Sequence, residues 1–277
     1  MGARKPRRQR LDALLVERGL FESRSKASAS VLAGEVHLGP GRERAAKPGM
    51  LVAEGIELDV ERPPRYVSRG GLKLERALAC FGVSPRGRLC LDVGASTGGF
   101  TDCLLKGGAP RVVALDVAYG ELHWDLRNDP RVTVIERSNA RSLQPGELPY
   151  APDLVTIDVS FIGLEKILPA VTGCAAKRFD LLALVKPQFE VGPDRVGKGG
   201  VVRSPDDRLE ALVRVGEAAR ALGLAVHGYC DSGLPGPAGN RESFIRCTEG
   251  ARSGVDDLVA AAAEAEPEAR EAAEVGR

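Results

Sequence analysis

The sequence has few residues of the kinds that build metal centres or disulfide frameworks. Its 277 residues include six cysteines and three histidines, with no Cys-x-x-Cys pair and no spacing typical of a zinc site. We therefore expect reduced core thiols in a cytoplasmic protein and no bound metal. No apolar run approaches the ~20 residues that span a membrane. The basic N-terminal stretch is not followed by an apolar segment, so no secretory signal is predicted.

Lysine is scarce, which makes each lysine informative. Only nine of the 39 basic residues are lysines, and the rest are arginines. Arginine cannot accept a proton, whereas a lysine shielded from water can. A lysine at the end of a predicted strand is therefore a candidate for catalysis. The formal net charge of +1 does not by itself indicate a nucleic-acid partner, and the hydrophobic content of 43% suffices for one large and one small domain.

The most informative segment combines a strand, a glycine-rich turn and a helix start over Leu91–Phe100. A second apolar strand, Val112–Leu115, ends in Asp116. This order is typical of Rossmann-like sheets that bind a nucleoside, because glycines let the ligand approach the backbone and the acid accepts hydrogen bonds from ribose hydroxyls. The turn lacks the Gly-x-Gly-x-x-Gly pattern of diphosphate binding. It therefore favours S-adenosylmethionine (SAM) over a nicotinamide dinucleotide.

Strand-like and helix-like segments alternate along the rest of the chain, which predicts an α/β fold with a Rossmann-like, doubly wound sheet of seven strands. We predict strands near 89–94, 111–117, 132–136, 153–158, 180–186, 225–230 and 243–248, and helices near 99–106, 121–128, 164–176 and 205–222.

Charged residues follow several of these strands, at the sheet edge where ligands bind in such folds. Asp158 and Lys186 each end an apolar strand. Glu242 precedes the last strand, so it reaches the same edge if the last two strands form an antiparallel hairpin. Lys73 lies on the predicted helix before the first strand, and spacing alone does not place it.

The chain divides into four segments. Residues 1–62 predict a small α+β domain with two short helices followed by short strands. Two prolines mark a linker over 63–67, and residues 68–250 form the large domain. Residues 251–277 are an Ala/Glu-rich tail that we expect to be flexible, either as a frayed helix or as a disordered segment.

Residues 1–62 resemble the alpha-L RNA-binding domain. The matching residues are Arg10–Asp12, Leu14, Leu15, Gly19, Ser23–Ala27, Gly34–Val36 and Lys47–Gly49. The resemblance implies that this domain binds RNA phosphates with a basic edge. Residues 1–62 contain twelve basic and nine acidic residues, so the excess of positive charge is small. The alternative to RNA binding is therefore a charged surface that contacts only solvent. The candidate RNA-binding residues are Arg10, Arg24, Lys26, Arg42 and Arg44 here, with Arg69 and Lys198 in the large domain.

Residues 66–248 resemble ribose 2′-O-methyltransferases of the FtsJ-like class, whose tetrad is Lys-Asp-Lys-Glu. The tetrad falls on Lys73, Asp158, Lys186 and Glu242. With the alpha-L domain in front, residues 10–248 resemble the TlyA (haemolysin A-type) rRNA 2′-O-methyltransferase family. That resemblance implies methylation of a cytidine ribose in 16S rRNA, 23S rRNA or both. The candidate SAM-binding residues are Asp92, Gly94, Ala95, Ser96, Thr97, Gly98, Gly99, Phe100, Asp116, Val117 and Asn139.

Two other functions stay open at this level. The first is a non-catalytic RNA-binding or ribosome-assembly protein that keeps the fold, against which the four filled tetrad positions argue. The second, more remote, is the membrane-damaging haemolysin that the family's name suggests. We expect a cytoplasmic monomer whose partners are ribosomal RNA and ribosomal subunits and not membranes. Fold reasoning does not select the nucleotide or the subunit.

Overall fold

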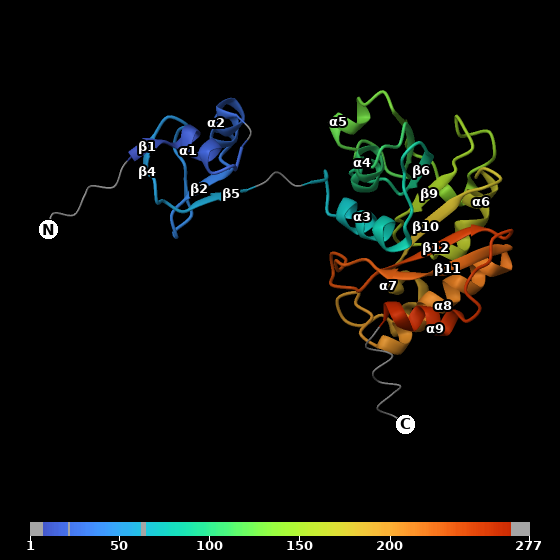
Figure 1. The fold of residues 1–277 in the computed structure, drawn as a ribbon. Helices are drawn as coiled ribbons and strands as arrows, with labels where there is room; N and C mark the ends of the chain where they lie inside the picture. The colour runs from blue at the N-terminus through green and yellow to red at the C-terminus, as the bar shows by residue number, and fades with distance from the viewer. Residues whose placement is uncertain (1–7, 22, 62–64, 267–277) are drawn as a thin grey trace. The chain divides into compact units, whose positions relative to one another are not determined.

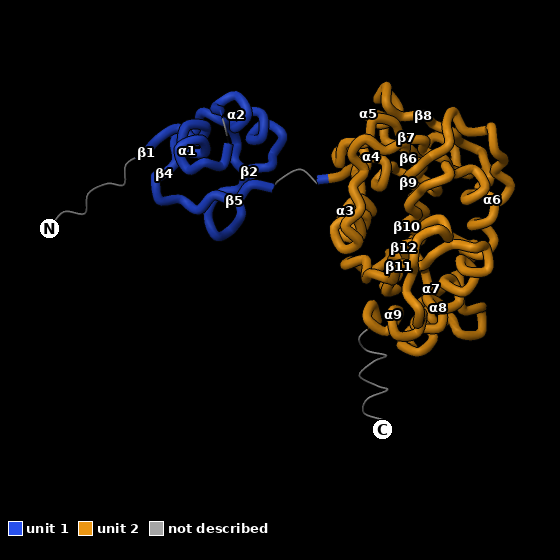
Figure 2. Tube along the Cα trace, turned by 45° about the vertical axis from the view of Figure 1, so that its right-hand side comes forward, with its two compact units in different colours: residues 1–65 blue, residues 66–277 orange. Residues whose placement is uncertain are grey.

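The structure is a computed structural model, described over residues 8–21, 23–61 and 65–266 (Figure 1). The chain forms two compact units, Met1–Arg65 and Tyr66–Arg277, which Figure 2 colours separately. The boundary between them falls within the predicted linker over 63–67, of which residues 63 and 64 lie outside the described part. Each unit is considered by itself below.

The N-terminal unit packs two helices, α1 (Leu11–Glu17) and α2 (Arg24–Ala33), against short antiparallel strands. Three strands form a sheet in the order β3-β2-β5, and β1 pairs with β4. These strands are β1 Arg8–Arg10, β2 Val36–Leu38, β3 Glu43–Arg44, β4 Leu51–Ala53 and β5 Leu58–Val60. Leu11, Leu15 and Val36 are fully buried, so the apolar positions of helices and strands share one small core.

The large unit is built on a seven-stranded sheet in the order β11-β12-β10-β9-β6-β7-β8. β12 runs antiparallel to both neighbours, and the pairs from β10 to β8 are parallel. The strands are β6 Leu89–Val93, β7 Arg111–Leu115, β8 Val132–Ile135, β9 Leu154–Ile157, β10 Asp180–Val185, β11 Leu224–Asp231 and β12 Ser243–Glu249. The predicted seven strands and C-terminal hairpin are confirmed. The start of β12 therefore lies at the edge where the parallel strands end.

Helices cover both faces of this sheet (Figure 1). One face carries α3 (Gly70–Phe81), α4 (Gly99–Lys106) and α5 (Trp124–Arg127), and the other carries α6 (Leu168–Gly173), α8 (Pro205–Ala221) and α9 (Leu258–Ala265). Successive strand residues face opposite sides of the sheet. Cys90 therefore belongs to the core beneath α3, α4 and α5, and Leu91 belongs to the core beneath α6, α8 and α9. Short helices complete the unit: α7 Pro187–Glu190 and the 3-10 turns Ala140–Ser142, Leu164–Lys166 and Pro193–Arg195.

Two predictions about the large unit need correction. The segment expected to be a flexible tail contains α9, which buries Leu258 and Ala262 against α8 and β11. Glu266, directly after α9, accepts a hydrogen bond from Arg208 Nε at 3.0 Å. Residues 267–277 lie outside the described part. The cysteines were all expected in the core, but Cys80 on α3 is exposed while the other five are buried.

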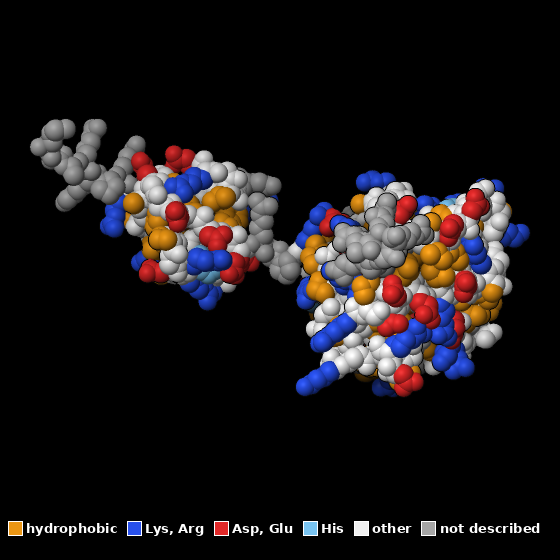
Figure 3. Space-filling view, turned by 90° about the horizontal axis from the view of Figure 1, so that it is seen from below, with side chains coloured by type: hydrophobic (Ala, Val, Ile, Leu, Met, Phe, Trp, Pro, Cys, Tyr) orange, Lys and Arg blue, Asp and Glu red, His pale blue; other side chains and the backbone are white. Residues whose placement is uncertain are grey.

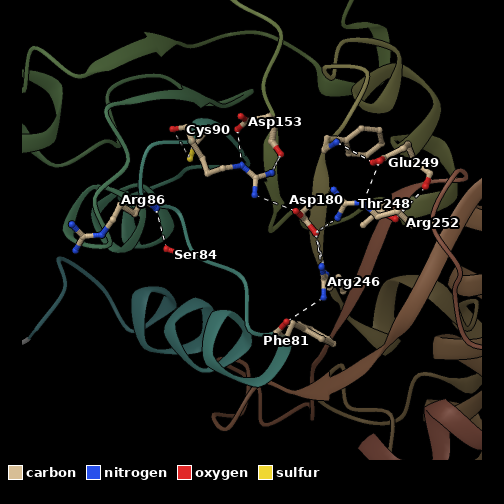
Figure 4. Close-up of polar contacts among 12 residues, drawn as sticks. Phe81, Ser84, Arg86, Cys90, Asp153, Asp180, Arg246, Thr248, Glu249 and Arg252 are labelled. Atoms are coloured by element: carbon tan, nitrogen blue, oxygen red, sulfur yellow. Dashed lines mark hydrogen bonds and ion pairs between the residues drawn. The ribbon is translucent and has the colours of Figure 1, made fainter.

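An ion-pair cluster ties strands together at the opposite edge of the sheet from the strand ends discussed below (Figure 4). Asp180, the first residue of β10, is buried and accepts hydrogen bonds from Arg246 of β12 at 2.8 Å and from Arg88 at 3.1 Å. Burial alone would raise the pKa of Asp180. The two guanidinium groups outweigh that effect and hold the pKa below its ordinary value.

We expect Asp180→Ala to lower the free energy of unfolding by about 3 kcal/mol at neutral pH, because it removes the carboxylate that pairs with Arg246 and leaves Arg88 with Asp153 as its partner. Since the pKa is depressed in the folded state, this stabilisation is present at neutral pH and is lost as the pH falls below ~4. Urea unfolding of wild type and variant at pH 7 and at lower pH measures both effects. Asp125→Ala is the control, because Asp125 is 77% exposed; equal losses in both variants would contradict the argument.

Candidate active site

A cavity of about 470 Å³ opens at the carboxyl ends of the parallel strands. Lys73, Asp158, Lys186 and Glu242 all line it, so the structure brings the four predicted tetrad residues together. They come from α3, from the ends of β9 and β10, and from the residue before β12. The antiparallel register pairs Ser243 with Val185, which brings the segments bearing Glu242 and Lys186 side by side.

Lys186 is held by two oxygen atoms. Its Nζ lies 2.6 Å from Asp158 Oδ1 and donates a hydrogen bond to Ser160 Oγ at 3.0 Å. The approach to Asp158 Oδ1 is an ion pair without good hydrogen-bond angles. The Lys186 and Asp158 side chains are 13% and 25% exposed. The ammonium group is therefore fixed in position while it still reaches the cavity.

Lys73 and Glu242 form the second pair, and it is more deeply buried. Lys73 Nζ donates to Glu242 Oε2 at 2.5 Å, and the side chains are 9% and 1% exposed. The loop before β12 also contacts the glutamate, because the Ser232 N–H donates a hydrogen bond to the backbone carbonyl of Glu242 at 2.9 Å. A Cβ at Gly236 would lie only 2.4 Å from Glu242 Oε1, so a residue without a side chain is needed there.

The turn after β6 depends on its glycines. Gly94 has a φ of +82°, and a Cβ there would lie 2.3 Å from the carbonyl oxygen of Asp158, which only glycine allows. Gly98, at φ +97°, faces Leu126 and does not line the cavity. Gly98 therefore shapes the turn without lining the cavity. The residues of the turn that line the cavity are Gly94, Ala95, Ser96, Thr97, Gly99 and Phe100.

A second cavity of about 460 Å³ adjoins the first. Both are bounded by Gly94, Ser96, Asp158 and Ser160, and the second also by Asp116, Val117 and Asn139. Asp116 Oδ2 accepts a hydrogen bond from Ser96 N–H at 2.7 Å, and its Oδ1 accepts one from Ala118 N–H at 2.8 Å. The two cavities together make one elongated site along the strand ends.

Asp92 does not face either cavity, which corrects its prediction as a cofactor ligand. Its side chain is fully buried and accepts hydrogen bonds from Thr101 Oγ1 at 2.7 Å and Thr156 Oγ1 at 3.2 Å. Burial raises the pKa of Asp92 to about 7. Asp92 thus fastens β6 to the start of α4 and to β9, and it supports the turn from beneath.

Sequence reasoning missed Ser160 and Phe161. Ser160 lines both cavities, and Phe161 lines the second with a side chain that is 90% exposed. Phe161 also has a φ of +65°, rare for a bulky residue, and its ring centroid lies 5.3 Å from that of Phe189. Only their position in the sequence could have identified the two phenylalanines. Each lies three residues after a strand-end charge, Phe161 after Asp158 and Phe189 after Lys186.

Five of the predicted RNA-binding residues lie in the N-terminal unit, and four of them are arginines with partners inside that unit. In the N-terminal unit, Arg10 and Arg24 both pair with Asp12, and Arg42 pairs with Asp59. Arg44 donates to the carbonyl of Ala33, and Lys26 is exposed. Figure 3 shows basic and acidic side chains interspersed on this unit.

The other two candidates lie in the large unit. Arg69 lines the first cavity and donates to the carbonyl of Pro235 at 3.2 Å. Lys198 is exposed in the loop after α7.

Comparison with known proteins gives four further findings. The family model described as FtsJ-like methyltransferase matches residues 66–249. A Mycobacterium tuberculosis protein named 16S/23S rRNA (cytidine-2'-O)-methyltransferase TlyA is 49% identical over 241 residues, covering 86% of this chain and 89% of that protein. Hemolysin A of Brachyspira hyodysenteriae is 43% identical over 205 residues, covering 74% and 84%. A solved structure from Streptococcus thermophilus is 39% identical with a TM-score of 0.70, covering 98% of this chain and 100% of the other.

No helix among the described residues is both long enough and apolar enough to cross a bilayer.

Proposed function

The chain belongs to the FtsJ-like methyltransferase family, and from that premise we propose that it transfers a methyl group from SAM to a ribose 2′-hydroxyl of ribosomal RNA. The observation that carries the proposal is the convergence of four charged residues, in two ion pairs, on one cavity beside a glycine turn. A cytidine of 16S or 23S rRNA is the expected target, because the M. tuberculosis relative is named for that activity.

The elongated site suits SAM. When bound, SAM supplies a methyl group on a positively charged sulfur, ready for in-line displacement. The turn from Gly94 to Phe100 would line its methionine and ribose side, and Asp116 would accept hydrogen bonds from the ribose hydroxyls. Val117 and Asn139, which line the second cavity and not the first, would lie along the adenine. Gly94 supports this assignment indirectly, since the lack of a side chain lets the turn pack against the Asp158 carbonyl and so brings both segments to the cavity wall.

The tetrad would act on the ribose hydroxyl, which is a weak acid. Lys186 stands on the cavity wall, oriented by Asp158. In its neutral form Lys186 Nζ can accept the hydroxyl proton, and in its charged form it stabilises the alkoxide. Lys73, fixed by Glu242, adds a second positive charge near the same oxygen. Alignment of the hydroxyl with the methyl group supplies a further part of the acceleration.

The N-terminal unit is proposed to bind the RNA substrate. Its resemblance to the alpha-L domain and its exposed arginines support that role. The N-terminal unit carries charges of both signs. We therefore propose that particular clusters of basic side chains bind the RNA phosphates, and not a uniformly basic surface.

Transfer of labelled methyl from SAM to unmodified ribosomal subunits tests the proposed function. We would offer 30S and 50S subunits separately and look for alkali-resistant label in the RNA, since a 2′-O-methyl group blocks alkaline cleavage at that ribose. Label on one or both subunits supports the proposal and identifies the target. Absence of label from both, with SAM binding intact, would point to another RNA or to a binding protein without activity.

We expect Asp116→Ala to weaken SAM binding by about 10–100-fold, because it removes a charged acceptor from the second cavity. Isothermal titration with SAM measures the affinity, and a melting curve verifies that the variant is folded. Asp129→Ala provides a matched control: this aspartate pairs with Arg131 and lines neither cavity. Unchanged affinity in folded Asp116→Ala would remove Asp116 from the site.

A further inference from the structure

Two of the candidate RNA-binding arginines converge on one carboxylate in the N-terminal unit. Arg10 donates from Nε to Asp12 Oδ1 at 3.1 Å and from Nη2 to Asp12 Oδ2 at 2.8 Å. Arg24 Nη2 donates to the same Oδ2 at 3.0 Å. Arg10 precedes α1 and Arg24 begins α2, so a single side chain joins the starts of both helices.

The three side chains differ sharply in exposure. The Asp12 side chain is 4% exposed, whereas those of Arg10 and Arg24 are 51% and 57% exposed. A carboxylate at such depth is costly unless hydrogen bonds compensate its charge. The hydrogen bond from Arg10 is the main cause that holds the pKa of Asp12 well below its ordinary value, and Arg24 adds to it. Asp12 is therefore an anion buried beneath two outward-facing guanidinium groups.

The backbone around Asp12 fixes this arrangement from the other side. Asp12 N–H donates to the carbonyl of Pro48 at 3.0 Å, and Leu11 N–H donates to that of Met50 at 2.9 Å. The turn between these two carbonyls passes against Arg10. A Cβ at Gly49 would lie 3.0 Å from Arg10 Nη2, so the absence of a side chain there leaves room for the guanidinium.

We propose that Asp12 is a positioning residue that sets Arg10 and Arg24 as a two-guanidinium site for one backbone phosphate of the RNA. The inference rests on the proposed function of the N-terminal unit. The cluster has a net charge of +1, which matches the single charge of a phosphodiester. Each planar fork presents its outer N–H groups in a fixed direction, as a phosphate requires. Arginines held in place before binding also lose less side-chain entropy when the RNA arrives.

The proposal and simple charge counting predict opposite effects for Asp12→Asn. The substitution removes a negative charge, so counting charges predicts tighter RNA binding. If Asp12 positions the two arginines, the loss of its charge releases them, and binding weakens. Asp59→Asn is the matched control, because Asp59 pairs with Arg42 at 2.7 Å but is 51% exposed and holds a single arginine. Its loss should leave binding unchanged or tighten it.

The experiment measures the dissociation constant of the full chain for unmodified 30S and 50S subunits over a range of KCl concentrations. For Asp12→Asn we expect binding about 5–10-fold weaker and a salt slope reduced by about one, with SAM affinity unchanged. Binding by Asp12→Asn that is equal to or tighter than wild type would overturn the proposal.

A second variant keeps the test decisive if Asp12→Asn unfolds the unit, which limited proteolysis detects. Gly49→Ala leaves every charge in place and crowds the Arg10 guanidinium, so we expect binding about 2–3-fold weaker. Wild-type binding by a folded Gly49→Ala would then count against the proposal. Methyl transfer by the wild type is assayed separately. Loss of the methyltransferase assignment would therefore be seen in the transfer assay, and failure of the Asp12 inference in binding.

Discussion

Replacing Lys186 with alanine is expected to lower kcat for methyl transfer by about 10²–10⁴-fold, the range typical of a general base or of a group that stabilises a developing oxyanion. SAM affinity should change little, since Lys186 lines the first cavity but not the second, where the nucleoside is proposed to lie. The measurements are single-turnover methyl transfer to the unmodified form of the target subunit and SAM titration. Near wild-type turnover by Lys186→Ala would refute the assignment.

Two companion variants sharpen this test. Lys177→Ala removes an exposed lysine just before the same strand, β10, at the edge away from the cavity, and should leave turnover unchanged. Lys186→Arg keeps the positive charge but cannot accept a proton. If the lysine acts as a base, Lys186→Arg should be as inactive as Lys186→Ala. Partial activity in Lys186→Arg would instead indicate that the charge stabilises the alkoxide.

Strand ends are the part of the site that the sequence predicts best. An apolar run that ends in one charge predicts both a strand and the edge at which the charge lies, which is how Asp158 and Lys186 were identified. Glu242 belongs at the same edge if the last two strands form a hairpin, and the antiparallel pairing of β11 with β12 confirms that prediction. Lys73 could not be placed by the same pattern, because the position of α3 over the sheet depends on tertiary packing. Only the family resemblance named it.

The misses have a common cause in side-chain direction and packing, which a linear pattern does not specify. Asp92 lies near the end of the same kind of apolar segment as Asp158 and Lys186, yet its side chain is enclosed and hydrogen-bonded by two threonines. The Ala/Glu composition of the tail is typical of a frayed helix or of disorder, but a few apolar residues suffice to pack α9 firmly against α8 and β11. Arg10 and Arg24 were identified singly. Their convergence on Asp12 depends on how two helices pack.

Glu242→Ala is expected to damage both stability and activity. Its carboxylate is 1% exposed and compensates the charge of Lys73 from 2.5 Å away. Removing it leaves a buried ammonium group without a partner, which typically costs about 3–5 kcal/mol. The same change frees Lys73 from its proposed place beside the reacting oxygen, so we expect kcat to fall by about 10²-fold or more. Urea unfolding and methyl transfer on the same preparations measure the two losses.

A double variant separates the two roles of this pair. Lys73→Met combined with Glu242→Leu replaces the ion pair with apolar side chains of similar volume, a change that is often neutral for stability when a buried pair is exchanged as a whole. We expect its unfolding free energy to return close to that of wild type, SAM binding to persist, and methyl transfer to stay lost. Wild-type transfer by this variant would show that the pair serves the fold alone. A double variant as unstable as Glu242→Ala would instead mean that the unpaired charge is not the source of the instability.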